Sequence, residues 1–218
     1  MDFKNFVETA NLLEASGYDS LNLHKQVGLL TEAEQRLLQA ALQFVVRNKL
    51  PVVVIGGVAV VSYISSARDL TPDVDFLTDD LNTIKASLDQ NGMQYRPLAS
   101  FMVNGVQVGG IQVPDINADF LFANAGINRY IMKSAELRRF GGVQLPFATA
   151  EVLAIQKFVT ARARDSDDAF LLLQSGRLDQ KKFLTHVKRM EKLGLLAPRG
   201  SGDAGDPEEL ESYAGILV

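Results

Sequence analysis

The sequence contains no cysteine and only two histidines, His24 and His186. Without cysteine there is no disulfide bond and no thiolate metal site, and cysteine usage gives no indication of the redox compartment. The two histidines belong to no cluster, which argues against zinc chemistry, because zinc sites depend mainly on cysteine and histidine ligands. We therefore expect any metal ion to be held by oxygen ligands.

Long apolar segments and an excess of positive charge are also missing. The first residues, MDFKNFVETANLLEAS, lack the apolar core of a signal peptide, and no apolar run reaches the length of a membrane span. We therefore expect a cytoplasmic protein with no membrane partner. The formal charge is −4 and the pI is about 5.3, so contact with nucleic acid would require a local basic patch.

A substantial core is possible, because 47% of the 218 residues are hydrophobic. The length fits one domain, or one domain with a small helical appendage. We predict an N-terminal helical segment packed on the core over residues 1–50, the core itself over 51–148, and a C-terminal helical portion over 149–197. The Gly- and Pro-rich acidic stretch 198–218 is expected to be a loosely attached tail.

Local patterns predict several elements. Helical periodicity indicates helices over residues 3–17, 31–48, 81–90, 127–139, 150–162 and 179–193. Thr31 and Glu34 have the spacing of a capping box at the start of the second of these helices. Asn104-Gly105 indicates a tight hairpin turn between two β-rich runs.

The most informative stretch of the chain is Pro51 to Leu77, with the sequence PVVVIGGVAVVSYISSARDLTPDVDFL. Its β-branched run predicts a buried strand that stops at Gly56-Gly57, where a backbone without Cβ can turn tightly and approach a ligand. The apolar residues that follow predict a buried helix. The first N–H groups of that helix have no internal partner and could hold an anion such as phosphate.

Carboxylates follow this turn. Pro72 disfavours a helical conformation at Thr71, so a strand is expected next, with Asp73 and Asp75 on one face because side chains alternate along a strand. Two neighbouring carboxylates repel each other unless a cation or a proton lies between them. A third carboxylate, Asp119, lies on the alternating run DINADFLFA; Asp115 or Asn117 would take its place if the register slipped by two.

Three carboxylates on two strands beside a glycine turn suit nucleotide chemistry. Mg²⁺ prefers carboxylate and phosphate oxygens, and a pair of such ions can stabilise the attacking and leaving oxygens of a phosphoryl displacement. We expect a bound hydroxyl to attack the α-phosphate of a nucleoside triphosphate (NTP), with pyrophosphate leaving.

These segments resemble the DNA polymerase β-like nucleotidyltransferase superfamily. Within it, ARDLTPDVDFL and EVLAIQKFVTARARDSDDAFLLL look like the abortive-infection (AbiEii-type) nucleotidyltransferase toxins, over about residues 50 to 175. The resemblance implies an α/β (α+β) nucleotidyltransferase fold, with a mixed central sheet flanked by helices and with N- and C-terminal helical portions. The second glycine stands where many members have serine, and the chain ends earlier than many of the toxins.

The resemblance also implies roles for individual residues. Asp73, Asp75 and Asp119 would bind Mg²⁺ or Mn²⁺, and Lys157 and Asp165 would take part in nucleotide handling or activity. The nucleotide-binding set would comprise Gly56, Gly57, Arg68, Thr71 and Asp165, and the catalytic set Asp73, Asp75, Asp119 and Lys157. Simpler interpretations remain open: Lys157 and Arg68 as surface cations, and the acids near Asp165 as helix caps and ion pairs.

The expected function is transfer of a nucleoside monophosphate (NMP) from an NTP to a hydroxyl acceptor by a metal-dependent, toxin-like enzyme. The acceptor would be RNA, for example a tRNA 3′ end, or a small molecule such as an aminoglycoside, and an antitoxin protein would be a further partner. The alternative is a non-catalytic binding or regulatory module of the same fold in a toxin–antitoxin type system.

Overall fold

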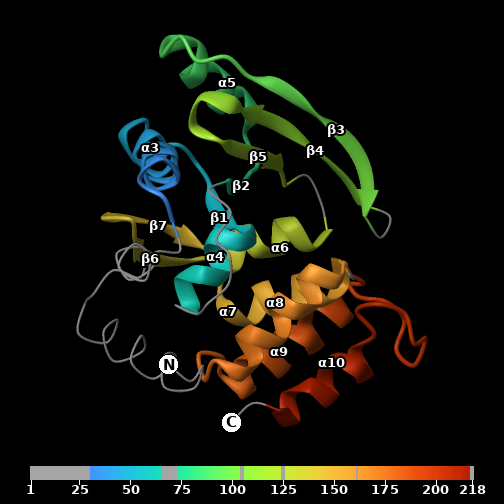
Figure 1. The fold of residues 1–218 in the computed structure, drawn as a ribbon. Coiled ribbons are helices and arrows are strands. Elements are labelled where there is room, and N and C mark those ends of the chain that lie inside the picture. Colours follow the sequence, from blue (N-terminus) through green and yellow to red (C-terminus); the bar gives the residue numbers. More distant parts are fainter. Residues whose placement is uncertain (1–29, 65–72, 104–105, 124–125, 161, 217–218) are drawn as a thin grey trace.

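The structure, a computed structural model, describes residues 30–64, 73–103, 106–123, 126–160 and 162–216, with the side chains of 99–103, 106–108 and 216 left aside. The helix expected over residues 3–17 and the turn at Asn104-Gly105 lie outside these residues. Figure 1 shows strands in the upper and middle parts of the molecule and a layer of C-terminal helices below them. No helix among the described residues is both long enough and apolar enough to cross a membrane.

The centre of the fold is a seven-stranded mixed sheet with the strand order β3-β4-β5-β2-β1-β7-β6. Its strands are β1 (Val53–Ile55), β2 (Val74–Thr78), β3 (Arg96–Val103), β4 (Val106–Val113), β5 (Ala118–Phe122), β6 (Glu136–Phe140) and β7 (Val143–Phe147). β2 runs antiparallel to β1 and parallel to β5. The predicted α/β fold with a mixed central sheet flanked by helices is thereby confirmed.

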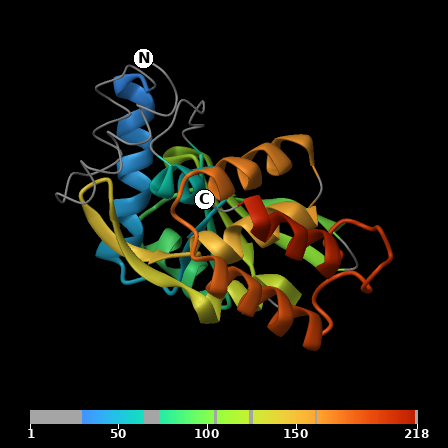
Figure 2. The same ribbon diagram turned by 90° about the horizontal axis from the view of Figure 1, so that it is seen from below.

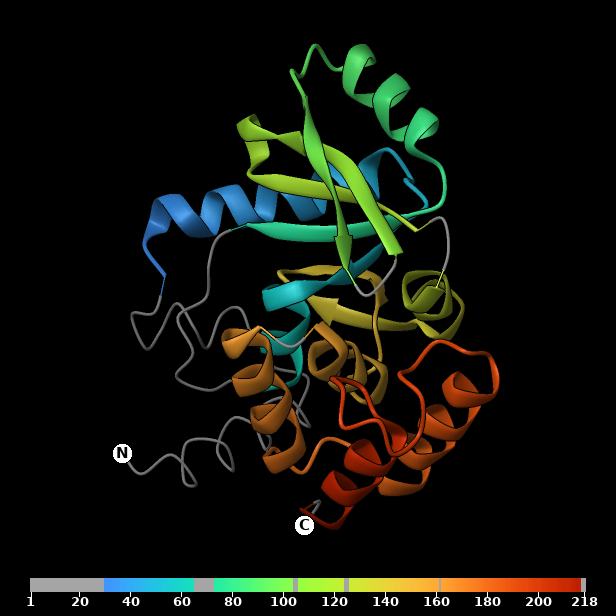
Figure 3. The ribbon, with the colours of Figure 1, turned by 90° about the vertical axis from the view of Figure 1, so that its right-hand side faces the viewer.

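Helices connect and cover the strands. They are α3 (Glu32–Arg47), α4 (Gly56–Tyr63), α5 (Leu81–Gln90), α6 (Gly126–Ser134), α7 (Ala150–Thr160), α8 (Ala163–Gln174), α9 (Gln180–Lys192) and α10 (Pro207–Tyr213), with short 3₁₀ turns η1 (Pro114–Ile116) and η2 (Ala214–Ile216). Seen from below in Figure 2, α3 lies on one side of the molecule and α9 and α10 on the other. Figure 3 likewise separates α3, beside the strands, from the C-terminal helices.

Two local predictions correspond closely to the observed elements. Thr31 and Glu34 form the expected capping box, in which each side chain accepts a hydrogen bond from the other residue's backbone N–H. The helix predicted over 81–90 is α5, which begins after Asp80 because the Asp80 carboxylate accepts a hydrogen bond from the Thr83 N–H.

The core lies between the sheet and its helices. Phe76 of β2 and Phe120 of β5 are fully buried and stack with a ring-centroid distance of 5.1 Å. They lie one residue beyond Asp75 and Asp119, and because side chains alternate along a strand, the two acids point to the opposite face of the sheet. The buried aromatic pair therefore fixes which face of the sheet carries the carboxylates.

The helix predicted over residues 127–139 is wrong in its second half. It ends at Ser134, and Glu136–Phe140 is strand β6, which pairs antiparallel with β7. The Arg138 side chain donates a hydrogen bond to the Ser62 carbonyl and its guanidinium lies 3.8 Å from the centroid of the Tyr63 ring. Contacts with distant segments thus override the local helical pattern.

The expected loose attachment of the C-terminal stretch is also wrong. Residues 207–216 form α10 and η2, and Leu210 and Ala214 are buried. The Tyr213 ring stacks on Phe158 of α7 with a centroid distance of 4.4 Å. Polar residues dominate the sequence of this stretch, but a few apolar side chains suffice to dock it on the helical layer.

Candidate active site

Asp75 and Asp119 lie directly opposite each other on the neighbouring parallel strands β2 and β5. Residues in register on adjacent strands point to the same face, so the two carboxylates face the same side. Asp73 precedes β2, and the adjacent Val74 N–H donates to the Asn117 carbonyl. In this register Asp119, rather than Asp115 or Asn117, is opposite Asp75.

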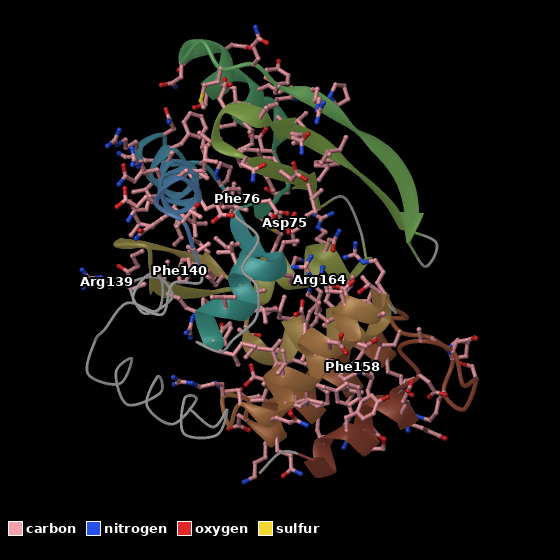
Figure 4. The ribbon with its side chains drawn as sticks, viewed as in Figure 1. Asp75, Phe76, Arg139, Phe140, Phe158 and Arg164 are labelled. Atoms are coloured by element: carbon pink, nitrogen blue, oxygen red, sulfur yellow. The ribbon has the colours of Figure 1, made fainter. Side chains whose placement is uncertain are left out.

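The protein environment raises the pKa of Asp75 to about 7. Burial is the main cause, and the charges of Asp73 and Asp119 add to it, whereas Lys157 and Arg162 act in the opposite direction. Burial also raises the pKa of Asp119. Figure 4 shows Asp75 near the middle of the molecule, between the outer strands of the sheet and the helical layer.

Gly56 brings the backbone of the first strand–helix turn against Asp75. Gly56 has a φ of +65°, and a Cβ added to it would lie 2.0 Å from Asp75 Oδ2. Gly56 and Gly57 begin α4, and the N-cap Ile55 has no side chain that could satisfy the first N–H groups. The turn therefore presents backbone donors next to the carboxylates, in a space that a side chain would fill.

Lys157 lies in a buried ionic cluster. Its Nζ is 2.5 Å from Asp165 Oδ1 and 3.0 Å from Asp168 Oδ2, and all three side chains are less than a tenth exposed. The other oxygen of Asp165 accepts hydrogen bonds from Thr160 Oγ1 and from Arg162 Nε. Arg162, in contrast to Lys157, is 75% exposed. In Figure 4, Arg164 near the start of α8 lies between Asp75 and Phe158.

Two further residues lie beyond Asp119, on the side of β5 away from β2. Gln112 of β4 is opposite Asp119 and hydrogen-bonds its carboxylate, and Arg96 of β3 is opposite Gln112. Sequence patterns did not single out either residue. Only the pairing of β3, β4 and β5 brings them to the acids.

The remaining predicted residues are placed as follows. Gly57 lies in the first turn of α4, and Asp165 lies in the first turn of α8. Arg68 and Thr71 lie outside the described residues. Asp168, which the sequence pattern treats as a helix cap or ion-pair residue, is one turn from Asp165 on the same face of α8, a spacing that could have indicated a shared partner.

The carboxylates of Asp73, Asp75 and Asp119 provide oxygen ligands, which hard divalent cations such as Mg²⁺ prefer. Among the residues that the structure describes, no three His, Cys, Asp or Glu side chains lie close enough to surround one metal ion. Mg²⁺, however, is usually held by one or two carboxylates together with water and substrate phosphates. Asp75 and Asp119, which are opposite each other on neighbouring strands, supply two such carboxylates, and Asp73 precedes the same strand as Asp75.

A shallow cavity of about 320 Å³ lies elsewhere, between α3, the end of α5 and η1. It is lined by Ala40, Gln43, Phe44, Arg47, Asn48, Asn91, Met93 and Ile116. Polar side chains in its lining form hydrogen bonds with one another: Arg47 with Gln43, and Asn91 with Asn48. Asp73, Asp75 and Asp119 do not line this cavity, and its lining contains no carboxylate, so we do not assign it a catalytic role.

Comparisons with known proteins do not assign this chain to a family. No protein-family model matches the sequence, and no curated protein sequence matches it significantly. A solved structure of an antigenic nucleotidyltransferase-like protein from Paracoccidioides brasiliensis aligns with a TM-score of 0.47 and 10% sequence identity, covering 87% of this chain and 95% of that one. The function is therefore assigned from the residues of this chain.

Proposed function

We propose that the protein is a metal-dependent nucleotidyltransferase that moves an NMP from an NTP to a hydroxyl acceptor. The main support for this proposal is that Asp75 and Asp119 are opposite each other on neighbouring parallel strands. The backbone of Gly56 also approaches the Asp75 carboxylate closely. Like charges this close, in a partly buried place, raise the free energy of the metal-free protein, and a divalent cation would relieve their repulsion.

Asp73, Asp75 and Asp119 would hold Mg²⁺ or Mn²⁺. When bound, such an ion neutralises phosphate charge and stabilises charge that develops on the reacting oxygens. The N–H groups of Gly56 and Gly57 would hydrogen-bond the triphosphate at the start of α4. Arg68, Thr71 and Asp165 complete the proposed nucleotide-binding set.

The transfer is a single displacement. A bond forms between the acceptor oxygen and the α-phosphorus while the bond to the β-phosphate oxygen breaks, and pyrophosphate leaves. Asp119 would accept the proton of the acceptor hydroxyl. Lys157 would help to neutralise phosphate charge, and its ammonium, paired with Asp165 and Asp168, acts to lower the pKa of Asp75. Catalysis then depends mostly on position and electrostatics.

The acceptor is proposed to be RNA, such as a tRNA 3′ end, in a toxin-like activity that an antitoxin protein would control. The acidic net charge means that RNA would have to approach through local cations such as Arg162 and Arg164 near the start of α8. A small hydroxyl compound such as an aminoglycoside is the second acceptor class for the test.

The test incubates the purified protein with each α-labelled NTP, Mg²⁺ and either total RNA or an aminoglycoside panel. We expect label to move to one acceptor class with one or two NTPs, and Asp75→Asn to abolish the transfer. Calorimetric titration of NTP with Mg²⁺ is the parallel measurement. If wild-type protein binds no NTP, the enzyme proposal is wrong; if it binds NTP but transfers nothing, the non-catalytic module is favoured.

A further inference from the structure

A row of side chains crosses four neighbouring strands and ends at the acids. Arg96 of β3 is opposite Gln112 of β4, Gln112 is opposite Asp119 of β5, and Asp119 is opposite Asp75 of β2. Partners in such a row share one face of the sheet. The row therefore connects an exposed arginine at the sheet edge with the half-buried carboxylate of Asp119.

The chemistry of the row leaves one orientation for the Gln112 amide. Arg96 Nε donates to Gln112 Oε1 over 2.8 Å, and Arg96 Nη2 donates to the same oxygen. A guanidinium has donors only, so the amide oxygen must face Arg96 and the amide NH₂ must face the other neighbour. That neighbour is the Asp119 carboxylate, to which Gln112 hydrogen-bonds.

A flip of the amide would break these contacts together. It would turn the NH₂ group toward the guanidinium and the carbonyl oxygen toward the carboxylate, so that donors face donors and acceptors face acceptors. Arg96 thus fixes Gln112, and Gln112 in turn fixes one side of Asp119. Gln112 contacts the Asp119 carboxylate from the neighbouring strand β4, and Asp75 is opposite Asp119 on the strand on its other side, β2.

We infer that Gln112, locked by Arg96, is a positioning residue that orients the Asp119 carboxylate toward the divalent cation of the proposed site. This inference rests on the proposed function, because Asp119 requires a fixed orientation only if it is a ligand. Hydrogen-bond partners of metal ligands orient them, and losing such a partner typically lowers metal affinity 10- to 100-fold.

The experiment measures Mn²⁺ affinity by electron paramagnetic resonance on the full chain, with and without a non-hydrolysable NTP analogue. Gln112→Met keeps the length of the side chain but removes its hydrogen bonds, and we expect it to weaken Mn²⁺ binding roughly 10- to 100-fold. Gln144→Met is the matched control. Gln144 is exposed on β7 and lies opposite an arginine, Arg139 of β6, away from the acids. The control should bind Mn²⁺ as the wild type does.

Arg96 provides a second pair of variants with little risk to folding, because its side chain is exposed. Arg96→Met frees the Gln112 amide and should weaken Mn²⁺ binding, whereas Arg96→Lys keeps a donor for Gln112 and should restore part of the affinity. Urea unfolding of each variant distinguishes weaker Mn²⁺ binding from a loss of stability. If Arg96 had only a structural role, Arg96→Met would lower stability and Arg96→Lys would not restore Mn²⁺ affinity.

The outcomes separate the two proposals. If Asp119→Asn weakens Mn²⁺ binding while Gln112→Met and Arg96→Met bind Mn²⁺ like the wild type, the positioning role is overturned and the proposed function stands. If the wild type binds no Mn²⁺ under either condition, both are overturned. Weakened binding in Gln112→Met and Arg96→Met, with partial recovery in Arg96→Lys, supports the positioning role.

Discussion

At the scale of single residues, Gly56 sets how closely the first strand–helix turn approaches Asp75. Its positive φ disfavours any side chain, and the contact of 2.0 Å between an added Cβ and Asp75 Oδ2 forbids one. Both features follow from one requirement, the close approach of backbone to a carboxylate.

Gly56→Ala is expected to destabilise the fold by two effects. The left-handed backbone conformation costs about 1 to 2 kcal/mol for alanine, and displacing Asp75 should add on the order of 1 to 3 kcal/mol. Gly92→Ala is the matched control, because Gly92 has a φ of +67° and nothing within 4 Å of an added Cβ. Urea unfolding measures both, and equal losses would contradict the predicted clash with Asp75.

Asp75 predicts a pH dependence of stability. Its pKa is about 7 in the folded chain and near 4 in an unfolded one, so the folded protein binds this proton more tightly. The free energy of unfolding of the metal-free protein should therefore fall as the pH rises from about 4 to about 7, and then level off.

The Asp75→Asn variant lacks this titration. We expect it to be more stable than the wild type at pH 8 by a few kcal/mol, since one pKa unit corresponds to about 1.4 kcal/mol, and to differ little near pH 4. Urea unfolding in EDTA at both pH values is the measurement. Asp115→Asn, at an exposed acid, should change stability by less than about 0.5 kcal/mol. A pH-independent difference between Asp75→Asn and wild type would refute the raised pKa.

At the scale of elements, the ionic cluster joins α7 to α8. Lys157 comes from α7, and both of its carboxylate partners come from one face of α8. Removing one partner of a buried ion pair leaves a charge that neither water nor a counter-ion compensates.

Lys157→Met should therefore lower the free energy of unfolding by about 3 to 5 kcal/mol, because Asp165 and Asp168 lose their shared buried cation, and the exposed Arg162 remains only as a partner of Asp165. Lys181→Met, on the exposed face of α9, should cost less than about 0.5 kcal/mol. Thermal and chemical unfolding are the measurements. A loss as small as that of the control would show that the cluster is not a structural connection between the two helices.

At the scale of the whole molecule, the C-terminal stretch closes the helical layer. Tyr213 contacts both Phe158 and Phe170, with centroid distances of 4.4 Å and 5.3 Å, and Leu210 is fully buried. Because these rings come from α7, α8 and α10, the layer is held together by side chains that are far apart in the sequence.

Tyr213→Ala should lower the free energy of unfolding by about 1 to 3 kcal/mol, since it removes partly buried aromatic surface and two ring contacts. Ser212→Ala, at the exposed neighbouring position, is the control and should have little effect. Far-UV circular dichroism and tyrosine fluorescence followed in the same urea titration should give one shared midpoint. An unchanged stability in Tyr213→Ala would mean that α10 does not contribute to the fold.

Features that depend on residues close together in the chain could be predicted from the amino-acid sequence. The capping box at Thr31, the bounds of α5 and the glycine turn all follow from backbone geometry and side-chain periodicity. The same periodicity predicts that Asp73 and Asp75 share one face. These features pointed to the acids as the site, whereas the α/β fold was predicted from the resemblance to nucleotidyltransferases.

Features that depend on strand register and helix packing became visible only in the folded chain. Residues 136–140 became strand β6 because β7 offered a partner, and α10 docked because Phe158 and Phe170 offered a surface. Gln112 reached Asp119 through the pairing of β4 with β5. The physical reason is that such contacts join residues distant in the chain, and local periodicity carries no information about which distant surfaces meet.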